Sequence, residues 1–208
     1  MKKSKKSLLI VLSLILVFCA ACSNGGNSGE NSVYTAENIA PSSDADIEHI
    51  KVCFDIENIG TFTVETYPEK APETVEHFLN LVDKGYYNGA SFEILNPGHS
   101  IVSSSLTALS SGECKETITG EFKKNGYSND LKLTRGTLAF CYLPGEYNSA
   151  TSKFMIFLGD DHGLDGSYAG FARVVDGTAV FDAISLKPIN ANNTPVSPIV
   201  MKKVYIKE

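Results

Sequence analysis

Alternating apolar and polar residues near position 50 predict two paired strands. The apolar members of the first run are Ile50, Val52, Phe54 and Ile56. Because successive side chains of a strand point to opposite faces, this spacing places all four on one buried face. A turn signal at residues 58–60 follows, and Phe62 and Val64 resume the alternation. Two such runs joined by a short turn are typical of a hairpin.

The apolar spacing changes to three and four residues after position 71. The apolar positions of this segment are Val75, Phe78, Leu79 and Val82. Side chains at these intervals share one face of a helix. Pro72 suits the first helical turn, where its missing N–H loses no partner, and Gly85 is typical of a helix end. We therefore expect an amphipathic helix that begins at Pro72 and ends before Gly85.

Short apolar runs separated by turn-forming residues predict the remaining elements. We expect strands at residues 92–95, 137–143, 154–158 and 199–206. A second short helix is expected at residues 178–184. Many short strands with only two helices indicate a mainly β fold, and we expect a barrel.

The first 21 residues have the three parts of a secretory signal peptide. Lysines at positions 2, 3, 5 and 6 precede an apolar run at 8–18, which only Ser13 interrupts, and small residues follow. This run is shorter than the about 20 apolar residues that a membrane-spanning helix needs. We therefore expect residues 1–21 to be removed as the protein leaves the cytoplasm.

Cys22 stands where a bacterial lipoprotein is cleaved and acylated. Ala20 and Ala21 precede it, which resembles a lipobox, although Cys19 occupies the position that usually holds leucine. Acylation holds a protein at a membrane surface without a spanning helix. We expect anchoring through Cys22 to the outer face of the bacterial cell membrane. The alternative is an ordinary signal peptide cleaved near Ala21, which would release a soluble protein.

Residues 22–46 predict a flexible linker. The segment is rich in Ser, Asn, Gly and acidic residues, and its few apolar side chains have no sustained period. Such a composition buries too little apolar surface to fold. The expected organisation is therefore a signal peptide at 1–21, a lipid-anchored linker at 22–46 and one folded domain at 47–208.

Composition excludes several classes of function. The 208 residues include 18 basic and 24 acidic ones, for a net charge of −6, which becomes −10 without the four lysines of the signal segment. Because nucleic-acid binding depends on Lys and Arg that neutralise phosphates, we expect no nucleic-acid partner. The cysteines left beyond Cys22 are Cys53, Cys114 and Cys141, with no Cys-x-x-Cys pair among them. We expect neither a disulfide framework nor a metal site.

From residue 47 onward the chain resembles the cyclophilin family. Matching motifs, in the family's order, include Tyr67-Pro68-Glu69-Lys70-Ala71-Pro72, Lys84-Gly85-Tyr86-Tyr87, Pro97-Gly98, Gly120-Glu121-Phe122, Thr134-Arg135-Gly136 and Leu164-Asp165-Gly166. The resemblance implies an eight-stranded antiparallel cyclophilin-like barrel capped by two helices, with a peptide groove on its outer face. It also implies isomerisation of X–Pro bonds without a cofactor, in proline-containing peptides or secreted proteins. We expect a monomer.

Isomerisation of an X–Pro bond makes few chemical demands. The barrier comes from amide resonance and is about 18 to 20 kcal/mol, so a catalyst must favour the twisted state, in which the nitrogen lone pair is localised. An apolar pocket for the proline ring and a hydrogen-bond donor aimed at the prolyl nitrogen meet this demand. In cyclophilins the donor is generally the arginine of a Phe-His-Arg stretch.

The implied groove departs from the family where this donor should be. The corresponding stretch is Phe92-Glu93-Ile94, so Ile94 replaces the arginine. Lys153 stands for a usual glutamine and Met155 for the phenylalanine below the proline ring, whereas Leu164 and Tyr168 fit bacterial relatives. By resemblance the groove is assigned to Leu164, Tyr168, Met155, Ile94, His99 and Cys141. No catalytic residue is assigned.

Three functions fit these observations. The first is a weak or altered isomerase on an exported lipoprotein, and the second is a catalytically silent module that binds a peptide or protein. The third is a barrel used only as a spacer or assembly partner. Lys153, with three donors on a flexible stem, is the candidate to replace the missing arginine.

We expect structural roles for the other reactive residues. His99 near Ser103–Ser105 lacks the flanking signature of a nucleophile and its base. The acidic stretch at 160–165 lacks the ligand spacing of a calcium loop. Arg135 matches a scaffold position of the family, so we expect it to lie off the groove.

Overall fold

The computed structural model describes residues 47–104 and 114–208. The predicted signal peptide and linker, with Cys22, lie outside the described residues, and so does Ser105. Within the two described ranges, no helix is long and apolar enough to span a membrane.

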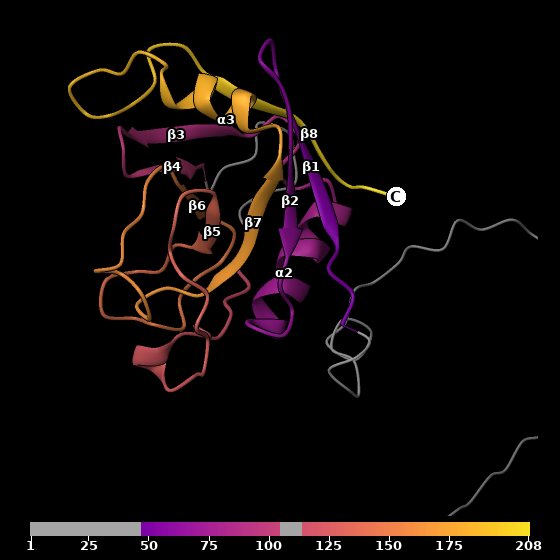
Figure 1. Ribbon diagram of the computed structural model, residues 1–208, viewed down its shortest axis with the longest axis vertical. Coiled ribbons are helices and arrows are strands. Elements are labelled where there is room, and N and C mark those ends of the chain that lie inside the picture. The colour runs from indigo at the N-terminus through magenta and orange to yellow at the C-terminus, as the bar shows by residue number, and fades with distance from the viewer. Residues whose placement is uncertain (1–46, 105–113) are drawn as a thin grey trace, which may run out of the picture. The chain divides into compact units, whose positions relative to one another are not determined.

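The strands of the described chain close into an eight-stranded antiparallel barrel (Figure 1). They are β1 Lys51–Ile56, β2 Gly60–Thr66, β3 Ser91–Asn96, β4 Ser100–Ser103, β5 Thr137–Phe140, β6 Phe154–Phe157, β7 Gly170–Asp176 and β8 Ile199–Ile206. Around the barrel the order is β1-β2-β7-β5-β6-β4-β3-β8. The helices α2 (Pro72–Asp83) and α3 (Thr178–Ser185) lie at opposite ends of it. The predicted mainly β barrel with two helices is confirmed.

The elements with a clear period form where the pattern predicts them. β1 and β2 pair from Lys51↔Glu65 to Ile56↔Gly60, and α2 begins at Pro72. The strand predicted at 137–143 is too long, because β5 ends at Phe140 and the chain turns at Leu143, whose carbonyl accepts the Glu146 N–H at 2.8 Å. β4 was not predicted, because its four residues include only two apolar ones, which are adjacent and show no alternation.

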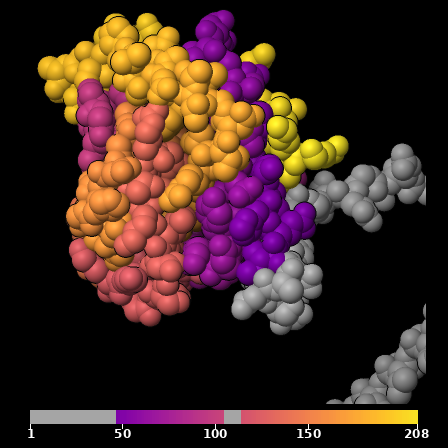
Figure 2. All heavy atoms as spheres, viewed as in Figure 1, coloured from indigo at the N-terminus to yellow at the C-terminus, as the bar shows by residue number. Residues whose placement is uncertain are grey.

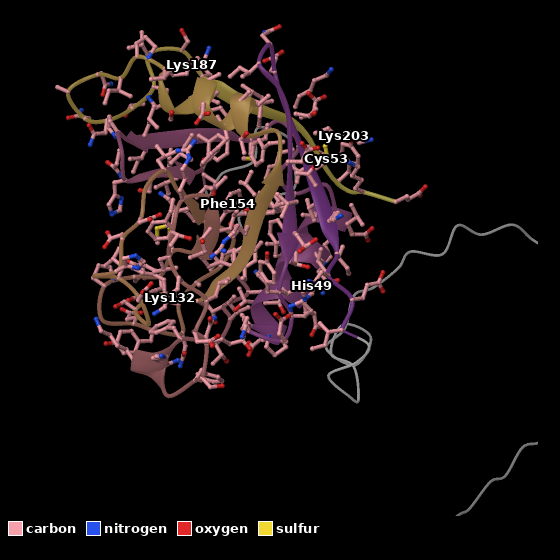
Figure 3. All side chains as sticks on the ribbon, in the orientation of Figure 1. His49, Cys53, Lys132, Phe154, Lys187 and Lys203 are labelled. Carbon is pink, nitrogen blue, oxygen red and sulfur yellow. The ribbon has the colours of Figure 1, made fainter. Side chains whose placement is uncertain are left out.

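Aromatic rings fill the barrel interior. Phe54 of β1 stacks on Phe62 of β2 with 4.8 Å between ring centroids, and Phe78 of α2 lies 5.0 Å from Phe171 of β7. Phe154 of β6 is fully buried near the middle of the barrel (Figure 3). Burying one such side chain contributes about 1.5–3 kcal/mol to the free energy of unfolding, so this interior is the main source of stability.

The N-terminus of α2 is capped by a residue distant in sequence. Glu121 Oε2 accepts the Thr74 N–H at 2.8 Å and the Thr74 hydroxyl at 2.6 Å, and Oε1 accepts the Glu73 N–H at 3.2 Å. A carboxyl group at this place accepts hydrogen bonds from N–H groups that have no partner within the helix. Burial raises the pKa of the Glu121 carboxyl, and the bonds from Thr74 act in the opposite direction. The Gly120-Glu121-Phe122 motif therefore supports the scaffold.

Candidate functional site

A second apolar cluster lies on the outer side of the barrel. Its buried members are Val102, Leu133, Ala139, Met155 and Phe157, and its partly exposed members are Ile94, Cys141, Leu164 and Tyr168. We call these nine residues the outer apolar face. On β6, Met155 and Phe157 belong to this face, whereas Phe154 and Ile156 belong to the interior. The alternation along the strand therefore separates the two clusters.

Cross-strand pairing aligns the middle of the outer apolar face. Ile94 on β3 is opposite Val102 on β4, and Val102 is opposite Met155 on β6. Met155 is in turn opposite Ala139 on β5. Directly opposed residues have Cβ atoms about 4.5–5.5 Å apart, so these four positions form one row across four strands.

The loop between β6 and β7 completes the face with Leu164 and Tyr168. Asp165 Oδ1 accepts the Leu133 N–H at 2.9 Å, which ties the loop to the segment before β5. The Tyr142 ring lies 4.9 Å from the Tyr168 ring, and its hydroxyl donates to the Ser167 carbonyl at 3.0 Å. In the space-filling view, the salmon and orange segments that follow β4 form one continuous side of the molecule beside the indigo β1–β2 hairpin (Figure 2).

The structure brings together the six side chains predicted to form the groove. Ile94, Cys141, Met155, Leu164 and Tyr168 all belong to the outer apolar face. His99 lies at its edge, with its ring centroid 5.9 Å from that of Phe157. Their proximity agrees with one shared site, and their role in binding peptide stays a prediction.

The floor of the outer apolar face is covered. Only 8% of Val102 and 6% of Met155 are exposed. Met155 occupies the position that the resemblance places below a proline ring. The free protein therefore exposes little of Met155 to a proline ring.

A β-bulge explains why Glu93 and Ile94 both lie outside the barrel. β3 pairs Phe92 with Ser103 and Ile94 with Val102, so Glu93 is an extra residue between two pairs. Phe92 and Leu95 are both buried in the interior cluster. A strict alternation would place only one outward residue between two such positions, and the bulge adds the second. The sequence pattern alone did not reveal this bulge.

Lys153 forms an ion pair with Glu93. β4 lies between β3 and β6 in the barrel, so the pair bridges over one strand. The Lys153 carbonyl accepts the Cys141 N–H at 2.8 Å. Burial raises the pKa of the Cys141 thiol to about 12, while Lys153 acts to lower it and Glu93 to raise it. Burial therefore disfavours the thiolate of Cys141, which lies beside two opposite charges.

His99 connects the β3–β4 turn to the loop after β6. Its Nδ1 lies 2.8 Å from Ser100 Oγ, and its Nε2 lies 3.0 Å from Asp161 Oδ2. Ser100 is only 2% exposed, and its Oγ also accepts a bond from Asn96 Nδ2 at 3.2 Å. A hydroxyl buried in this way cannot approach a substrate, so the Ser–His–Asp contact is structural rather than nucleophilic.

Arg135 contacts α3 rather than the outer apolar face. Its guanidinium donates to the Leu158 carbonyl at 2.8 Å, pairs with Asp182 and lies 5.0 Å from the centroid of the Phe181 ring. These contacts fasten α3 to the residue after β6. The expected scaffold role agrees with this geometry.

The acidic stretch at 160–165 is engaged with the protein itself. Asp160 accepts the Arg135 N–H at 2.9 Å, Asp161 contacts His99, and Asp165 contacts both Leu133 N–H and Lys132. Across residues 47–104 and 114–208, no group of three or more His, Cys, Asp or Glu side chains is arranged to hold a metal ion. Cys53, Cys114 and Cys141 are free thiols.

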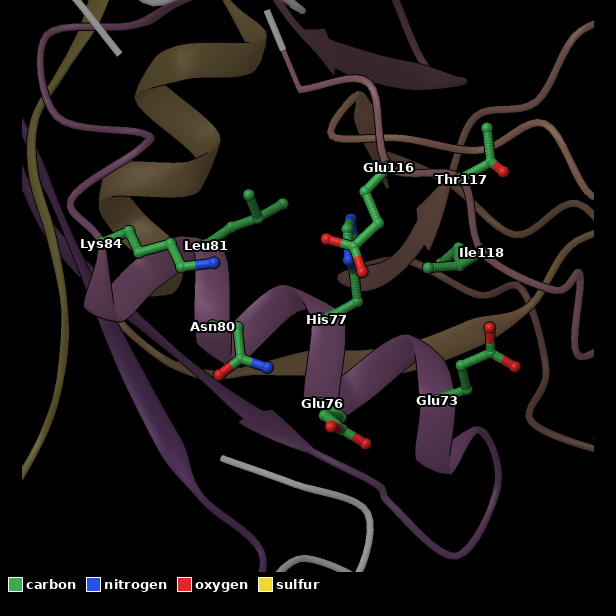
Figure 4. Close-up of a pocket in the computed structure, with 9 residues that line it drawn as sticks. All are labelled: Glu73, Glu76, His77, Asn80, Leu81, Lys84, Glu116, Thr117 and Ile118. Carbon is green, nitrogen blue, oxygen red and sulfur yellow. The ribbon is translucent and has the colours of Figure 1, made fainter. Parts of the chain in front are cut away.

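A separate hollow of about 240 Å³ lies between α2 and residues 116–118 (Figure 4). Its lining is polar and includes Glu73, Glu76 and His77 of α2 together with Glu116. Glu73 also accepts the Thr119 N–H at 3.0 Å, and His77 Nε2 donates to the Thr151 carbonyl. None of the predicted groove residues lines this hollow, so the outer apolar face is the candidate site.

Known proteins resemble most of this chain. Residues 51–206 match the family model described as cyclophilin type peptidyl-prolyl cis-trans isomerase/CLD. Peptidyl-prolyl cis-trans isomerase B of Escherichia coli is 36% identical over 163 residues, which cover 73% of this chain and 96% of that protein. A peptidyl-prolyl cis-trans isomerase of Acinetobacter baylyi is 33% identical over 159 residues, which cover 72% and 82%.

Solved structures share the fold. A cyclophilin type peptidyl-prolyl cis-trans isomerase of Cryptosporidium parvum superposes with a TM-score of 0.68 at 23% identity, over 77% of this chain and 99% of that one. The same protein in the presence of the dipeptide ala-pro gives a TM-score of 0.67 at 22% identity, over 76% and 99%. At these identities the likeness concerns the barrel alone.

Proposed function

Because the chain belongs to the cyclophilin-type peptidyl-prolyl cis-trans isomerase family, we propose that it binds proline-containing segments and isomerises their X–Pro bonds only weakly. Ile94 carries this proposal. It lies on β3 at one end of the row across the outer apolar face, opposite Val102, where the family's arginine would present a charged N–H to the prolyl nitrogen. A hydrocarbon side chain cannot stabilise the localised lone pair of the twisted imide.

The covered floor supports the same proposal. With Val102 and Met155 more than nine-tenths buried, the free protein offers a proline ring little open surface. Moving side chains to admit the ring uses binding energy that would otherwise favour the transition state. Both the missing donor and the covered floor therefore reduce the rate.

An isomerase assay of the purified full chain tests this proposal. We expect kcat/KM for an uncharged proline tetrapeptide to lie roughly a hundred- to a thousand-fold below that of a cyclophilin with the arginine, which is about the factor that one preorganised donor contributes. Exchange NMR of the peptide measures the rate without a coupling protease. A rate equal to that of the arginine-bearing enzyme would contradict the proposal, and so would a rate no better than buffer.

A catalytically silent binding module is the second candidate. The ion pair between Lys153 and Glu93 favours it, because it engages the side chain that could replace the arginine. NMR shift mapping with proline-containing peptides distinguishes the two candidates. Shifts at Leu164 and Tyr168 without any acceleration of exchange would favour the silent module.

We further propose that the chain is exported and anchored through acylated Cys22. The lysines of residues 1–21, their apolar run and the small residues before Cys22 support this. We expect mass spectrometry of the mature protein to find acyl chains on an N-terminal Cys22, and C22A to leave the membrane fraction. An unmodified mature N-terminus would contradict the anchor, and retention of residues 1–21 would contradict cleavage.

A further inference from the structure

We propose that Glu93 is a positioning residue that restrains Lys153, and that Lys153 is a latent hydrogen-bond donor of the groove. The inference rests on the proposed function and adds a second cause of low activity. The first cause is the absence of the arginine. The second is that a cation paired with the neighbour of Ile94 is held by that neighbour's carboxylate.

The bulge in β3 places Glu93 beside Ile94 on the outer side of the barrel. Glu93 is the extra residue between the pairs Phe92↔Ser103 and Ile94↔Val102. Without the bulge, Glu93 and Ile94 would point to opposite faces, and one of them would enter the barrel interior. The Glu93 carboxylate therefore lies at the same edge of the outer apolar face as Ile94, the position that lacks the arginine.

Lys153 reaches this edge from the other side of β4. Its ammonium pairs with Glu93, the chain neighbour of Ile94, and its stem is flexible. Its backbone carbonyl binds Cys141 N–H, and Met155 follows two residues later. Both groups belong to the outer apolar face, so Lys153 borders the candidate groove.

The restraint is weak enough to be released. The Lys153 and Glu93 side chains are 30% and 36% exposed, so water screens the ion pair and its two partners can separate. The opposite effects of the two charges on the pKa of the Cys141 thiol agree with their placement beside it. A lysine freed from Glu93 keeps three N–H donors on a flexible stem.

The chemistry needs only this one donor. Rotation about the X–Pro bond breaks and forms no covalent bond, so no proton or leaving group must be moved. An ammonium N–H that points at the prolyl nitrogen stabilises the localised lone pair of the twisted state. While Glu93 accepts from the ammonium, the same side chain cannot settle in this position.

Glu93→Gln tests the restraint, because it removes the charge and keeps the size of the side chain. With the full chain and an uncharged proline tetrapeptide, we expect kcat/KM to rise by up to about fivefold, because so exposed an ion pair can restrain its lysine by no more than about this factor. E93Q/K153M should lose the gain. Asp130→Asn is the matched control, since Asp130 pairs with Lys70 at 2.8 Å away from the outer apolar face and carries the same charge change.

The outcomes separate this inference from the proposed function. A gain in E93Q that disappears in E93Q/K153M, with D130N unchanged, supports the restraint. No gain in E93Q overturns it while leaving the weak basal rate of the wild-type chain intact. A gain that persists in E93Q/K153M also overturns it, because the donor then is not Lys153. If E93Q does not fold, E93A and E93A/K153M take its place, and the same comparison of the two rates decides.

Discussion

Ile94→Arg is expected to raise the isomerase kcat/KM by about tenfold to a hundredfold. The guanidinium would supply the missing donor at the prolyl nitrogen, and a preorganised donor of this kind contributes a factor of roughly a hundred to a thousand. We expect less than the full factor because the covered floor at Val102 and Met155 still hinders entry of the proline ring. Exchange NMR of an uncharged proline tetrapeptide measures the effect.

Two controls separate the donor from a general effect of charge or size. Ile94→Met changes the shape of the side chain without adding a donor and should leave the rate within about twofold. Val175→Arg adds the same charge on β7 at a residue that is 45% exposed, and should also have no effect. An I94R protein that folds and binds peptide without gaining rate would show that the pocket, and not the donor, limits activity.

Phe154→Ala is expected to lower the free energy of unfolding by about 3–5 kcal/mol, the range for removing a large buried aromatic side chain. Phe154 is fully buried, and its ring lies 5.3 Å from that of Tyr87, 6.0 Å from Phe54 and 6.2 Å from Phe78. We expect the cavity left by the Phe154 ring to stay largely open, because the rings around it are held by different elements of the fold. Denaturant unfolding of the variant and the parent chain measures the difference.

Leu186→Ala serves as the comparison for this substitution. Leu186 follows α3 and is 82% exposed, so its truncation should change the free energy of unfolding by less than about 0.5 kcal/mol. A loss below about 1 kcal/mol for F154A would contradict the view that the aromatic interior holds the barrel together.

The sequence pattern predicted those elements whose apolar residues recur at a regular spacing. β1, β2 and α2 show the period of two or of three and four residues. β4 does not, because its four residues Ser100–Ser103 include only two apolar ones, which are adjacent. The number of strands and their antiparallel arrangement came from the family resemblance, since the pairing of strands distant in the chain leaves no local period.

The resemblance predicted which residues form the candidate site, but not how their side chains are arranged. The resemblance assigned Ile94, Met155 and Tyr168 to one groove, and the structure places them in one apolar cluster, whose role in binding stays a prediction. The ion pair of Glu93 with Lys153 was missed, since it depends on a bulge and on partners 60 residues apart. The covering of Met155 was missed as well, because burial depends on how surrounding side chains pack.

A crystal structure of the full chain with a bound proline peptide tests the central claim most directly. We expect the proline ring on the outer apolar face, near Leu164 and Tyr168, with Lys153 still paired to Glu93. We expect no guanidinium or ammonium nitrogen within about 3.2 Å of the prolyl nitrogen, the limit of hydrogen-bond reach for a catalytic group. A charged nitrogen within that distance in the wild-type complex would contradict the account.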